Sequence, residues 1–323
     1  MPLLSRVQAP YWTSSYYRIN IELDAILRSR WIEIVTMSAF IAVDWGTTNR
    51  RAFRIEDGSV VATERDDRGA ANVAADEYEA EVAGIRDRLG DLPMLLAGMV
   101  GSNIGWRSVP YVAAPAGLPQ IAAALDRIDA RTAIVPGLSY RDGLHADVMR
   151  GEEVQLLGAV AAGLVPPDAL LCQPGTHCKW AAVEAGAIVR FTTAMTGELF
   201  ALLRAHGVLS RQLGHPVEPG TAFLDGVAEG AKRDLVASLF AIRARGVLGL
   251  ADDADAASFA SGLLIGADTA ARIEPGATVH ILADPALGAL YASAIDALGG
   301  TAHHIDSQAA FVAGITRIQD LAA

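Results

Sequence analysis

The sequence predicts an α/β protein built from two related lobes. Short apolar segments typical of β-strands alternate along it with longer segments of helical periodicity. One arrangement of strand, Gly-Thr turn, second strand and glycine hairpin occurs at residues 41–61 and again at residues 170–189. The 323 residues are enough for two lobes that each bury a core. A unit repeated in both halves indicates that the lobes share one design.

The first lobe is predicted over residues 37–168. Three short strands open it, joined by the Gly-Thr turn and an Asp-Gly hairpin: FIAVD, RAFRI and SVVATE. A helix with one apolar face is expected around residues 76–89, and buried strands at MLLAGM and TAIVPGL. The segment GEEVQLLGAVAAGLV is expected to be a helix, because acids in a first turn interact favourably with the helix dipole.

The second lobe is predicted over residues 169–323 and begins with the same three strands: ALLCQ, HCKWAAVE and AIVRFTT. Helices are expected from Thr196, from about Thr221, and across VASLFAIRARG and ADAASFASGLLIGADTAARI. The run TVHILAD is typical of a late strand, before a helix that Pro285 opens. TAHHI and SQAAFVAGITRIQDLA close the chain, and the last helix is a candidate to return to the first lobe.

Residues 1–36 do not fit this pattern. They contain Trp12, Trp31 and three tyrosines without clear periodicity, and Met37 follows directly before the first strand. Two interpretations stay open for this N-terminal extension. It is either non-native or disordered, with Met37 as the start, or an added docking arm.

Composition limits the classes of function. With 52% apolar and 20% charged residues, the chain is typical of a globular protein. The net charge of −11 argues against a nucleic-acid or anionic-membrane surface, since either would need a basic stripe. An anionic small molecule is still compatible, because a local arginine cluster could bind it. A homo-oligomer is also left open.

The cysteines and the apolar runs predict a cytoplasmic protein. Cys172 and Cys178 form no CxxC pair, and a disulfide between them would distort the strand-turn that they flank, so both are expected to be free thiols. No window is typical of a membrane helix; the longest uncharged run, 108–125, contains three prolines. The N-terminus lacks the pattern of a signal peptide.

The repeated Gly-Thr turn predicts phosphate binding. Such a turn presents backbone N–H groups and hydroxyls toward one point, and two of them facing across a cleft would grip the β- and γ-phosphates of a nucleotide. A single copy could be an ordinary hairpin, but two matched copies favour the nucleotide. Asp44, beside the first turn, is expected to hold Mg²⁺. Its counterpart Gln173 is neutral, and a second acid there would repel the γ-phosphate.

Five ordered motifs across residues 40–321 carry a resemblance to a known family: VDWGTTNRRAF, AGMVGSNIGWRSVPYVAAPAG, DVMRGEEVQLLGA, PGTHCKW and TTAMTGELFALLRAHGVLS. With them the chain resembles the 2-dehydro-3-deoxygalactonokinases, within the superfamily of sugar kinases, heat-shock proteins and actin. Two departures are Asn103, where a basic residue is expected, and Cys178, where a serine is expected.

The resemblance implies a fold and a reaction. The fold would be two ribonuclease-H-like lobes of the actin and hexokinase type around a nucleotide cleft. The reaction would be the phosphorylation, by ATP with Mg²⁺, of the terminal hydroxyl of 2-dehydro-3-deoxy-D-galactonate in galactonate catabolism. A kinase for another sugar or sugar acid, or a non-catalytic nucleotide-dependent switch of the same fold, is the alternative. The motifs GMVGSNIGW and PYVAAPAG argue against the switch, which would not need them.

Kinases of this superfamily take their base from a carboxylate in the cleft between the lobes. Here that implies Glu152, which directly follows Gly151, with Asp147 in reserve. The alternative for Glu152 is that it only stabilises the helix dipole. The candidate catalytic residues are Asp44, Asp147 and Glu152.

The carboxylate of the substrate calls for an arginine, because a guanidinium binds it through two hydrogen bonds. Arg150, beside the expected base, differs most from an ordinary surface arginine, while Arg50 and Arg51 follow the first turn. The aromatic candidates either wall the sugar site or pack in the core. The candidate substrate-binding residues are Ser102, Trp106, Arg107, Tyr111 and Arg150.

The nucleotide candidates come from both turns and from the turn after the late strand ILADPALGAL, where the superfamily binds adenine. Lys179 either neutralises phosphate, serves the substrate or is an exposed strand residue, and His177 either touches phosphate or makes a structural hydrogen bond. His303 and His304 lack metal-ligand spacing, so no zinc is assigned. The candidate nucleotide-binding residues are Gly46, Thr47, Thr48, Asn49, Gly175, Thr176, His177, Lys179, Asp284 and Gly288.

Overall fold

The computed structural model describes residues 39–323, and Ala39–Ala323 form one compact unit. The unit is a mixed α/β structure with two large sheets and one small sheet. The expectations for residues 1–36 lie outside the described part of the chain.

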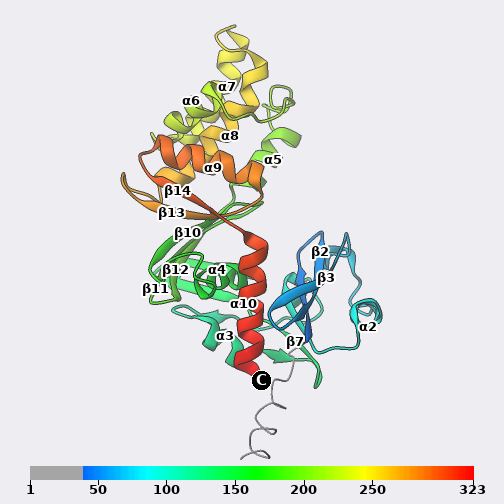
Figure 1. Ribbon diagram of the computed structural model, residues 1–323. Coiled ribbons are helices and arrows are strands. Elements are labelled where there is room, and N and C mark those ends of the chain that lie inside the picture. The colour runs from blue at the N-terminus through cyan, green and yellow to red at the C-terminus, as the bar shows by residue number, and fades with distance from the viewer. Residues whose placement is uncertain (1–38) are drawn as a thin grey trace, which may run out of the picture. The chain divides into compact units, whose positions relative to one another are not determined.

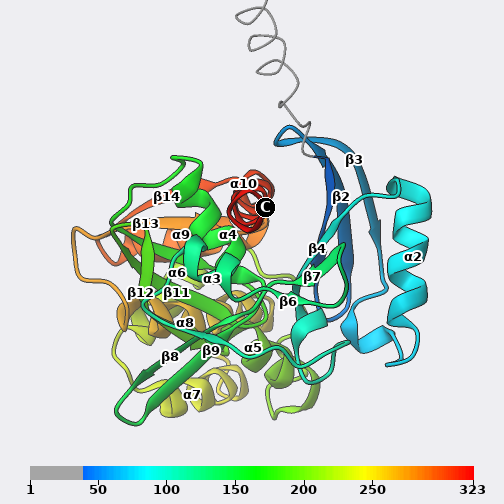
Figure 2. The same ribbon diagram turned by 90° about the horizontal axis from the view of Figure 1, so that it is seen from below.

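The first sheet has six strands in the order β3-β2-β1-β4-β7-β6. Its strands are β1 (Phe40–Trp45), β2 (Arg50–Glu56), β3 (Ser59–Asp66), β4 (Met94–Gly98), β6 (Asp126–Arg127) and β7 (Thr132–Ile134). The first three strands are antiparallel, and β4 and β7 continue the sheet parallel to β1. Helix α2 (Tyr78–Leu89) covers one face of this sheet (Figure 2), where Tyr78 and Ile85 are buried against Ile41 and Val43.

The second sheet has the order β12-β11-β10-β13-β14 and begins with the same antiparallel unit. Its strands are β10 (Ala169–Gln173), β11 (Cys178–Glu184), β12 (Ala187–Ala194), β13 (Thr278–Leu282) and β14 (Thr301–Ile305). The helices that gather on one side of it (Figure 1) are α5 (Thr196–His206), α6 (Thr221–Gly230), α7 (Leu235–Val247), α8 (Asp253–Ala270) and α9 (Pro285–Ala297).

The sequence repeat is a structural repeat, and the hairpins show it in detail. The turn residues Asp57 and Gly58 of the first unit, and Ala185 and Gly186 of the second, all have positive φ. Both central residues of the favoured two-residue hairpin turn need this conformation. Each hairpin also has a shift in register one or two residues before the turn. The repeated strands predicted from the sequence are therefore confirmed.

A small third sheet was not predicted. It comprises β5 (Val112–Ala113), β8 (Leu138–Asp142) and β9 (His145–Met149), with β8 and β9 forming a hairpin. Short helical segments connect the strands of the first half: η1 (Ala70–Asn72), η2 (Met99–Gly101) and α3 (Leu118–Ala123).

Helices α4 (Glu152–Ala161) and α10 (Ser307–Ala322) pack against each other in a core that includes residues of both large sheets (Figure 1). Glycines allow the helices to approach closely, because a Cβ on Gly158 or Gly314 would overlap the facing backbone. Phe311 of α10 packs on Phe53 of β2, with ring centroids 5.6 Å apart. Helix α10 also contacts α3, and Arg127 donates a hydrogen bond to the carbonyl of its last residue. The division at residue 168 stays a prediction.

Candidate active site

Two cavities meet where β1 and β10 end. The larger, of about 1160 Å³, lies between the first Gly-Thr turn and the segments that follow β13 and β14. The smaller, of about 470 Å³, lies between the second Gly-Thr turn, η2, β9 and the start of α4. The residues that line both, which we call the junction, are Asp44, Gly46, Thr47, Gln155, Gln173 and Pro174.

The first turn is closed by its own backbone and held by η1. The amide of Gly46 donates to the carbonyl of Asn49 at 2.9 Å. The carbonyls of Gly46, Thr47 and Thr48 accept hydrogen bonds from the amides of residues 69–71. With these carbonyls occupied, the polar groups that the turn can offer to the larger cavity are the amides and hydroxyls of Thr47 and Thr48.

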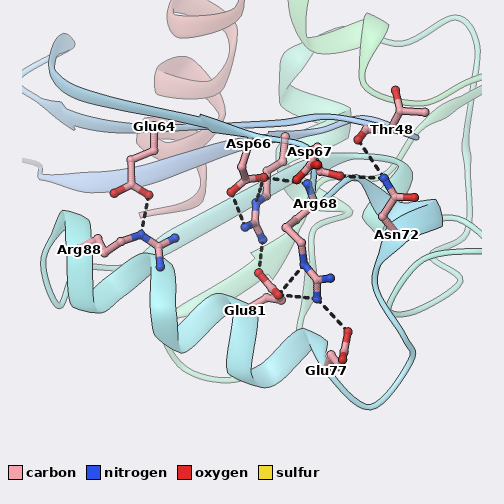
Figure 3. A network of polar contacts seen from close by, with 10 residues as sticks. Thr48, Glu64, Asp66, Asp67, Arg68, Asn72, Glu77, Glu81 and Arg88 are labelled. Atoms are coloured by element: carbon pink, nitrogen blue, oxygen red, sulfur yellow. Dashed lines mark hydrogen bonds and ion pairs between the residues drawn. The ribbon is translucent and has the colours of Figure 1, made fainter.

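A network of ion pairs supports this turn from below (Figure 3). Arg50 is only 2% exposed and pairs with Asp66 at 2.7 Å and Glu81 at 2.9 Å. Its guanidinium also lies 4.6 Å from the centre of the Trp45 ring. Burial acts to raise the pKa of Asp66, but the hydrogen bonds from Arg50 and the Arg68 amide bring it below its usual value. Arg50 therefore stabilises the turn and does not face a ligand.

Asp44 lies in a row of charged residues across three strands. It is in register with Arg51 of β2, which is in register with Arg65 of β3. Arg51 Nη2 lies 2.5 Å from Asp44 Oδ2, and the three side chains line the larger cavity. Arg65 was not predicted, although strand alternation places it on the same face as Arg51.

The second turn is held by the start of α5. The amide of Glu198 donates to the carbonyl of Thr176 at 2.9 Å, and Glu198 Oε2 lies 2.6 Å from His177 Nε2. His177 thus has the structural hydrogen bond that was one of its two interpretations, while it also lines the smaller cavity together with Gly175 and Thr176. Gly197 packs directly on the turn, with space for no Cβ.

The acids before and in α4 have three different environments. Glu152 is 28% exposed, lines the smaller cavity, and accepts a hydrogen bond from the Arg150 amide at 3.0 Å. Its other oxygen lies 3.8 Å from Lys179 Nζ. Glu153 is fully buried and accepts from the Gly151 amide at 2.7 Å. Burial, together with the charge of Glu152, raises the pKa of Glu153 to about 8.

Asp147 does not line either cavity. Its carboxylate accepts from the amide and the hydroxyl of Thr193, at 2.5 Å and 2.7 Å, and from the Val148 amide at 2.8 Å. Its role in this structure is to hold β9 to β12.

The side chain of Lys179 is buried, donates a hydrogen bond to Thr193 Oγ1 at 3.0 Å and lines the smaller cavity. The interpretation of Lys179 as an exposed strand residue is wrong.

Three of the five substrate candidates line the smaller cavity: Ser102, Tyr111 and Arg150. The guanidinium of Arg150 lies 4.3 Å from the centre of the Tyr111 ring and donates to the Val109 carbonyl at 2.6 Å. Its Nε and Nη1 have no hydrogen-bond partner among residues 39–323. Asn103, where a basic residue was expected, lines the same cavity.

The other two substrate candidates lie elsewhere. Arg107 is exposed and pairs with Asp126 at 3.4 Å, away from both cavities. Trp106 stacks on Tyr78, with ring centroids 5.9 Å apart, and packs on the core between α2 and the first sheet. Of the two interpretations of the aromatic candidates, Trp106 therefore fits packing in the core.

The segments after β13 and β14 form the far wall of the larger cavity. Asp284 lines it and caps α9 by accepting from the Ala286 amide at 3.0 Å. Gly288 does not line this cavity. It packs against the ring of His304, and that ring does line the cavity. The start of α10 was not predicted as part of the site, yet Ser307 and Gln308 line this cavity too.

The two thiols lie beneath the second turn. Cys172 and Cys178 are buried and free, as predicted, with their Sγ atoms 3.6 Å apart. Burial raises the pKa of the Cys172 thiol well above its ordinary value, so it is poorly reactive.

Two sheets that share one strand-turn-strand unit, each placing its Gly-Thr turn at a common junction, define an α/β protein of the actin and hexokinase fold class. The family model described as 2-keto-3-deoxy-galactonokinase matches residues 44–318, so the chain belongs to that family. The resemblance carried by the five motifs is thereby confirmed.

Individual relatives agree with this membership. The chain is 35% identical over 285 residues to the 2-dehydro-3-deoxygalactonokinase of Escherichia coli (strain K12), covering 86% of this chain and 97% of the relative. It is also 35% identical over 298 residues to "Probable 2-dehydro-3-deoxygalactonokinase DgoK1" of Rhizobium meliloti (strain 1021), covering 88% and 97%. A Sinorhizobium meliloti crystal structure assigned to the same enzyme superposes with a TM-score of 0.80 at 34% identity, covering 86% and 97%.

Proposed function

We propose that the protein transfers the γ-phosphoryl group of ATP to the 6-hydroxyl of 2-dehydro-3-deoxy-D-galactonate, a step of galactonate catabolism. The observation that carries this is the junction, where two cavities meet between two matching Gly-Thr turns in a chain of this family. A donor and an acceptor of a phosphoryl group need such adjoining sites, because transfer requires the reacting atoms in line. The names of the relatives support the substrate.

The larger cavity is proposed to bind ATP. Its volume and its two polar ends suit a nucleotide, with Thr47, Thr48 and Asn49 near the phosphates and Asp284 at the opposite wall. Arg51 and Arg65 add positive charge on the side of the first turn. The second turn, with Gly175, Thr176 and His177, would contact the terminal phosphate from the smaller cavity.

Asp44 fits a magnesium ligand. Mg²⁺ is usually held by one or two carboxylates together with substrate phosphates and water, and Asp44 is the carboxylate at the junction. Among residues 39–323 no cluster of three or more His, Cys, Asp or Glu side chains offers a metal a complete protein cage. When bound, the ion would neutralise charge on the phosphates. Asp44 Oδ2 pairs with Arg51, which holds the carboxylate in place.

Glu152 is proposed as the base. It faces the smaller cavity with one carboxylate oxygen near Lys179, whereas Asp147 is committed to Thr193 and lines neither cavity. The neighbouring oxygen of Glu152 lies 3.8 Å from Lys179 Nζ, so the proposed base has a cation beside it. The hydroxyl proton of the sugar acid would pass to Glu152 as the oxygen attacks phosphorus.

The carboxylate of the sugar acid is proposed to bind Arg150. This guanidinium lines the smaller cavity, where Tyr111 and Val109 fix it, and its charge has no carboxylate partner among residues 39–323, so the carboxylate of the substrate would supply one. Ser102 and Tyr111 would contact the sugar hydroxyls.

We place the reaction in the cytoplasm, where ATP is available and the two thiols stay reduced. Within residues 39–323, every helix is too short or too polar to cross a membrane.

The proposal is tested by an ATP-coupled assay over a panel of sugar acids that includes both C4 epimers, with glucose and galactose as neutral controls. We expect the galactonate-derived acid to have the highest kcat/KM. The neutral sugars should be poorer by about 30- to 5,000-fold, because they leave a buried arginine unpaired, at a cost of roughly 2–5 kcal/mol. A preference for a neutral sugar, or for another acid, would assign the protein to a different substrate. Nucleotide binding without turnover of any acceptor would favour a switch.

A further inference from the structure

Two neutral side chains lie at the junction together with Asp44. Gln155 lies on α4 and Gln173 ends β10, and both line both cavities. Gln173 Nε2 donates a hydrogen bond to Gln155 Oε1 at 3.0 Å. Gln155 is only 8% exposed, so its side chain has little freedom to turn.

The hydrogen bond decides which end of Gln155 is available. Its carbonyl oxygen is used by Gln173, which leaves the Nε2 amide as a donor, and no residue within 39–323 accepts from it. Gln173 Oε1 is buried without a partner in the same part of the chain. A buried amide oxygen without a hydrogen bond is unfavourable and rare. Its presence at the junction indicates that orienting Gln155 matters more here than satisfying Gln173.

The position on α4 places Gln155 beside the transfer path. It follows Glu152 by three residues, so the two side chains lie on the same face of the helix. Asp44 lines the junction from the first sheet and Gln155 from α4. A phosphoryl group that moves from the larger to the smaller cavity must pass these side chains.

We propose that Gln155 donates a hydrogen bond from Nε2 to the phosphoryl group during transfer, and that Gln173 positions Gln155 for this contact. The inference rests on the proposed function. The bond from phosphorus to the ADP oxygen breaks as the bond to the sugar oxygen forms, and the hydroxyl proton passes to Glu152. Negative charge is spread over the equatorial oxygens, where a fixed neutral donor stabilises it. An acid in either place would repel that charge.

The first test replaces Gln155 by methionine, which has a similar size and no donor. Loss of one fixed donor to a transition state costs about 10²–10³-fold in kcat, and we expect this loss. The affinity for a non-hydrolysable ATP analogue, measured by calorimetry, and the KM for the sugar acid should stay within about threefold. Gln319→Met on α10, which lines neither cavity, is the control and should match the wild type.

A kcat within about threefold of the wild type would overturn the role of Gln155, as would a loss that appears only in analogue affinity or KM. Thermal unfolding checks that the variants fold. If Gln155→Met does not, Gln155→Glu takes its place, since its carboxylate still accepts from Gln173 but cannot donate at neutral pH. The same loss of kcat is expected there, and wild-type turnover would again contradict the proposal.

The second test is a double-mutant cycle. Gln173→Met should lower kcat about tenfold in the wild-type background, and should lower it no further when combined with Gln155→Met, because Gln173 acts through Gln155. Equal losses in both backgrounds would refute the positioning role.

The wild-type protein separates this inference from the proposed function. If another acceptor proves to be the substrate, the same ratios of variant to wild type are measured with that acceptor. If no acceptor is phosphorylated, slow ATP hydrolysis by wild type and variants is compared. A loss of ATP hydrolysis in the Gln155 variant as large as the one expected for transfer would support the role of Gln155. An unchanged rate of hydrolysis would contradict it.

Discussion

The two Gly-Thr turns join equivalent strands but differ in length by one residue and in their electrostatic surroundings, because Asp44 pairs with Arg51 across the first and Gln173 pairs with Lys179 across the second. The first turn is flanked by Asp44 and Arg51 and rests on the ion pairs of Arg50 with Asp66 and Glu81 (Figure 3).

The second turn rests on buried, mostly neutral groups. Below it lie Cys172 and Cys178, and Trp180 donates to Asp268 at 2.9 Å. The hydrogen bond from Trp180 acts to lower the pKa of Asp268, but burial has the larger effect and raises it. The raised pKa favours the neutral form of Asp268. The residue that matches Asp44 is the neutral Gln173. Both copies therefore place a Gly-Thr turn beside the cavities, while the strand before the turn ends near a carboxylate in the first copy and at a neutral amide in the second.

The largest expected effect comes from removing that carboxylate. Asp44→Asn should fold and lose about 10³-fold or more in kcat, because a metal that bridges the phosphates contributes several kcal/mol. The measurement is kcat over a titration of Mg²⁺, with thermal unfolding in parallel. Normal turnover with an unchanged dependence on Mg²⁺ would contradict the role of Asp44 as a metal ligand. The two turns would then not differ in that role.

The next effect concerns the helix that starts between the turns. Glu152→Gln keeps the shape of the side chain but cannot accept the hydroxyl proton, so kcat should fall about 10²-fold or more. ATP-analogue affinity should change little. Asp147→Asn is the matched variant, and it should keep kcat within a few-fold while losing about 1–3 kcal/mol of stability through its contacts with Thr193. The reverse outcome would move the base to Asp147.

A third effect tests whether the turns are equivalent in shape. A Cβ on Gly69 would overlap the backbone of Thr48, and one on Gly197 would overlap that of Gly175. Gly69→Ala and Gly197→Ala should therefore each displace one turn and raise the KM for ATP about tenfold or more. Gly214→Ala is the control, because nothing lies within 4 Å of its Cβ position. If only one of the two variants raises the KM for ATP, the two turns do not contribute equally to nucleotide binding.

The last effect is on stability and not on turnover, and it is a pH dependence at Glu153. Its pKa is about 8 in the folded protein against an ordinary value of 4.5, so the folded state binds the proton more tightly than the unfolded state. Its contribution to stability is therefore present below about pH 4.5 and is lost as pH rises toward 8.

Glu153→Gln should remove this loss, so that its gain in stability over the wild type rises from about 1 kcal/mol at pH 5 to about 4 kcal/mol at pH 8, at 1.36 kcal/mol per pKa unit. Urea unfolding at a series of pH values measures it. Glu79→Gln, at an exposed position of α2, is the control. Parallel pH curves for wild type and Glu153→Gln would show that Glu153 is ionised in the fold.

The repeated strands, both Gly-Thr turns, the place of Asp44 beside the first turn and the family could all be predicted from the sequence. These features are local: strand alternation, turn residues and short motifs act over a few positions. Glu152 at the start of α4 belongs with them, because acids at helix starts follow a local rule.

Only the tertiary structure decided which of the candidates face the junction. Trp106 and Arg107 belong to a recognisable motif, yet they line neither cavity. Trp106 stacks on Tyr78, and Arg107 pairs with Asp126. Asp147 is bound by Thr193, a residue distant in sequence, and Gln155 gains its place from a hydrogen bond to Gln173 on another element. The direction of a side chain depends on packing between segments far apart along the chain, and a local pattern contains no information about that packing.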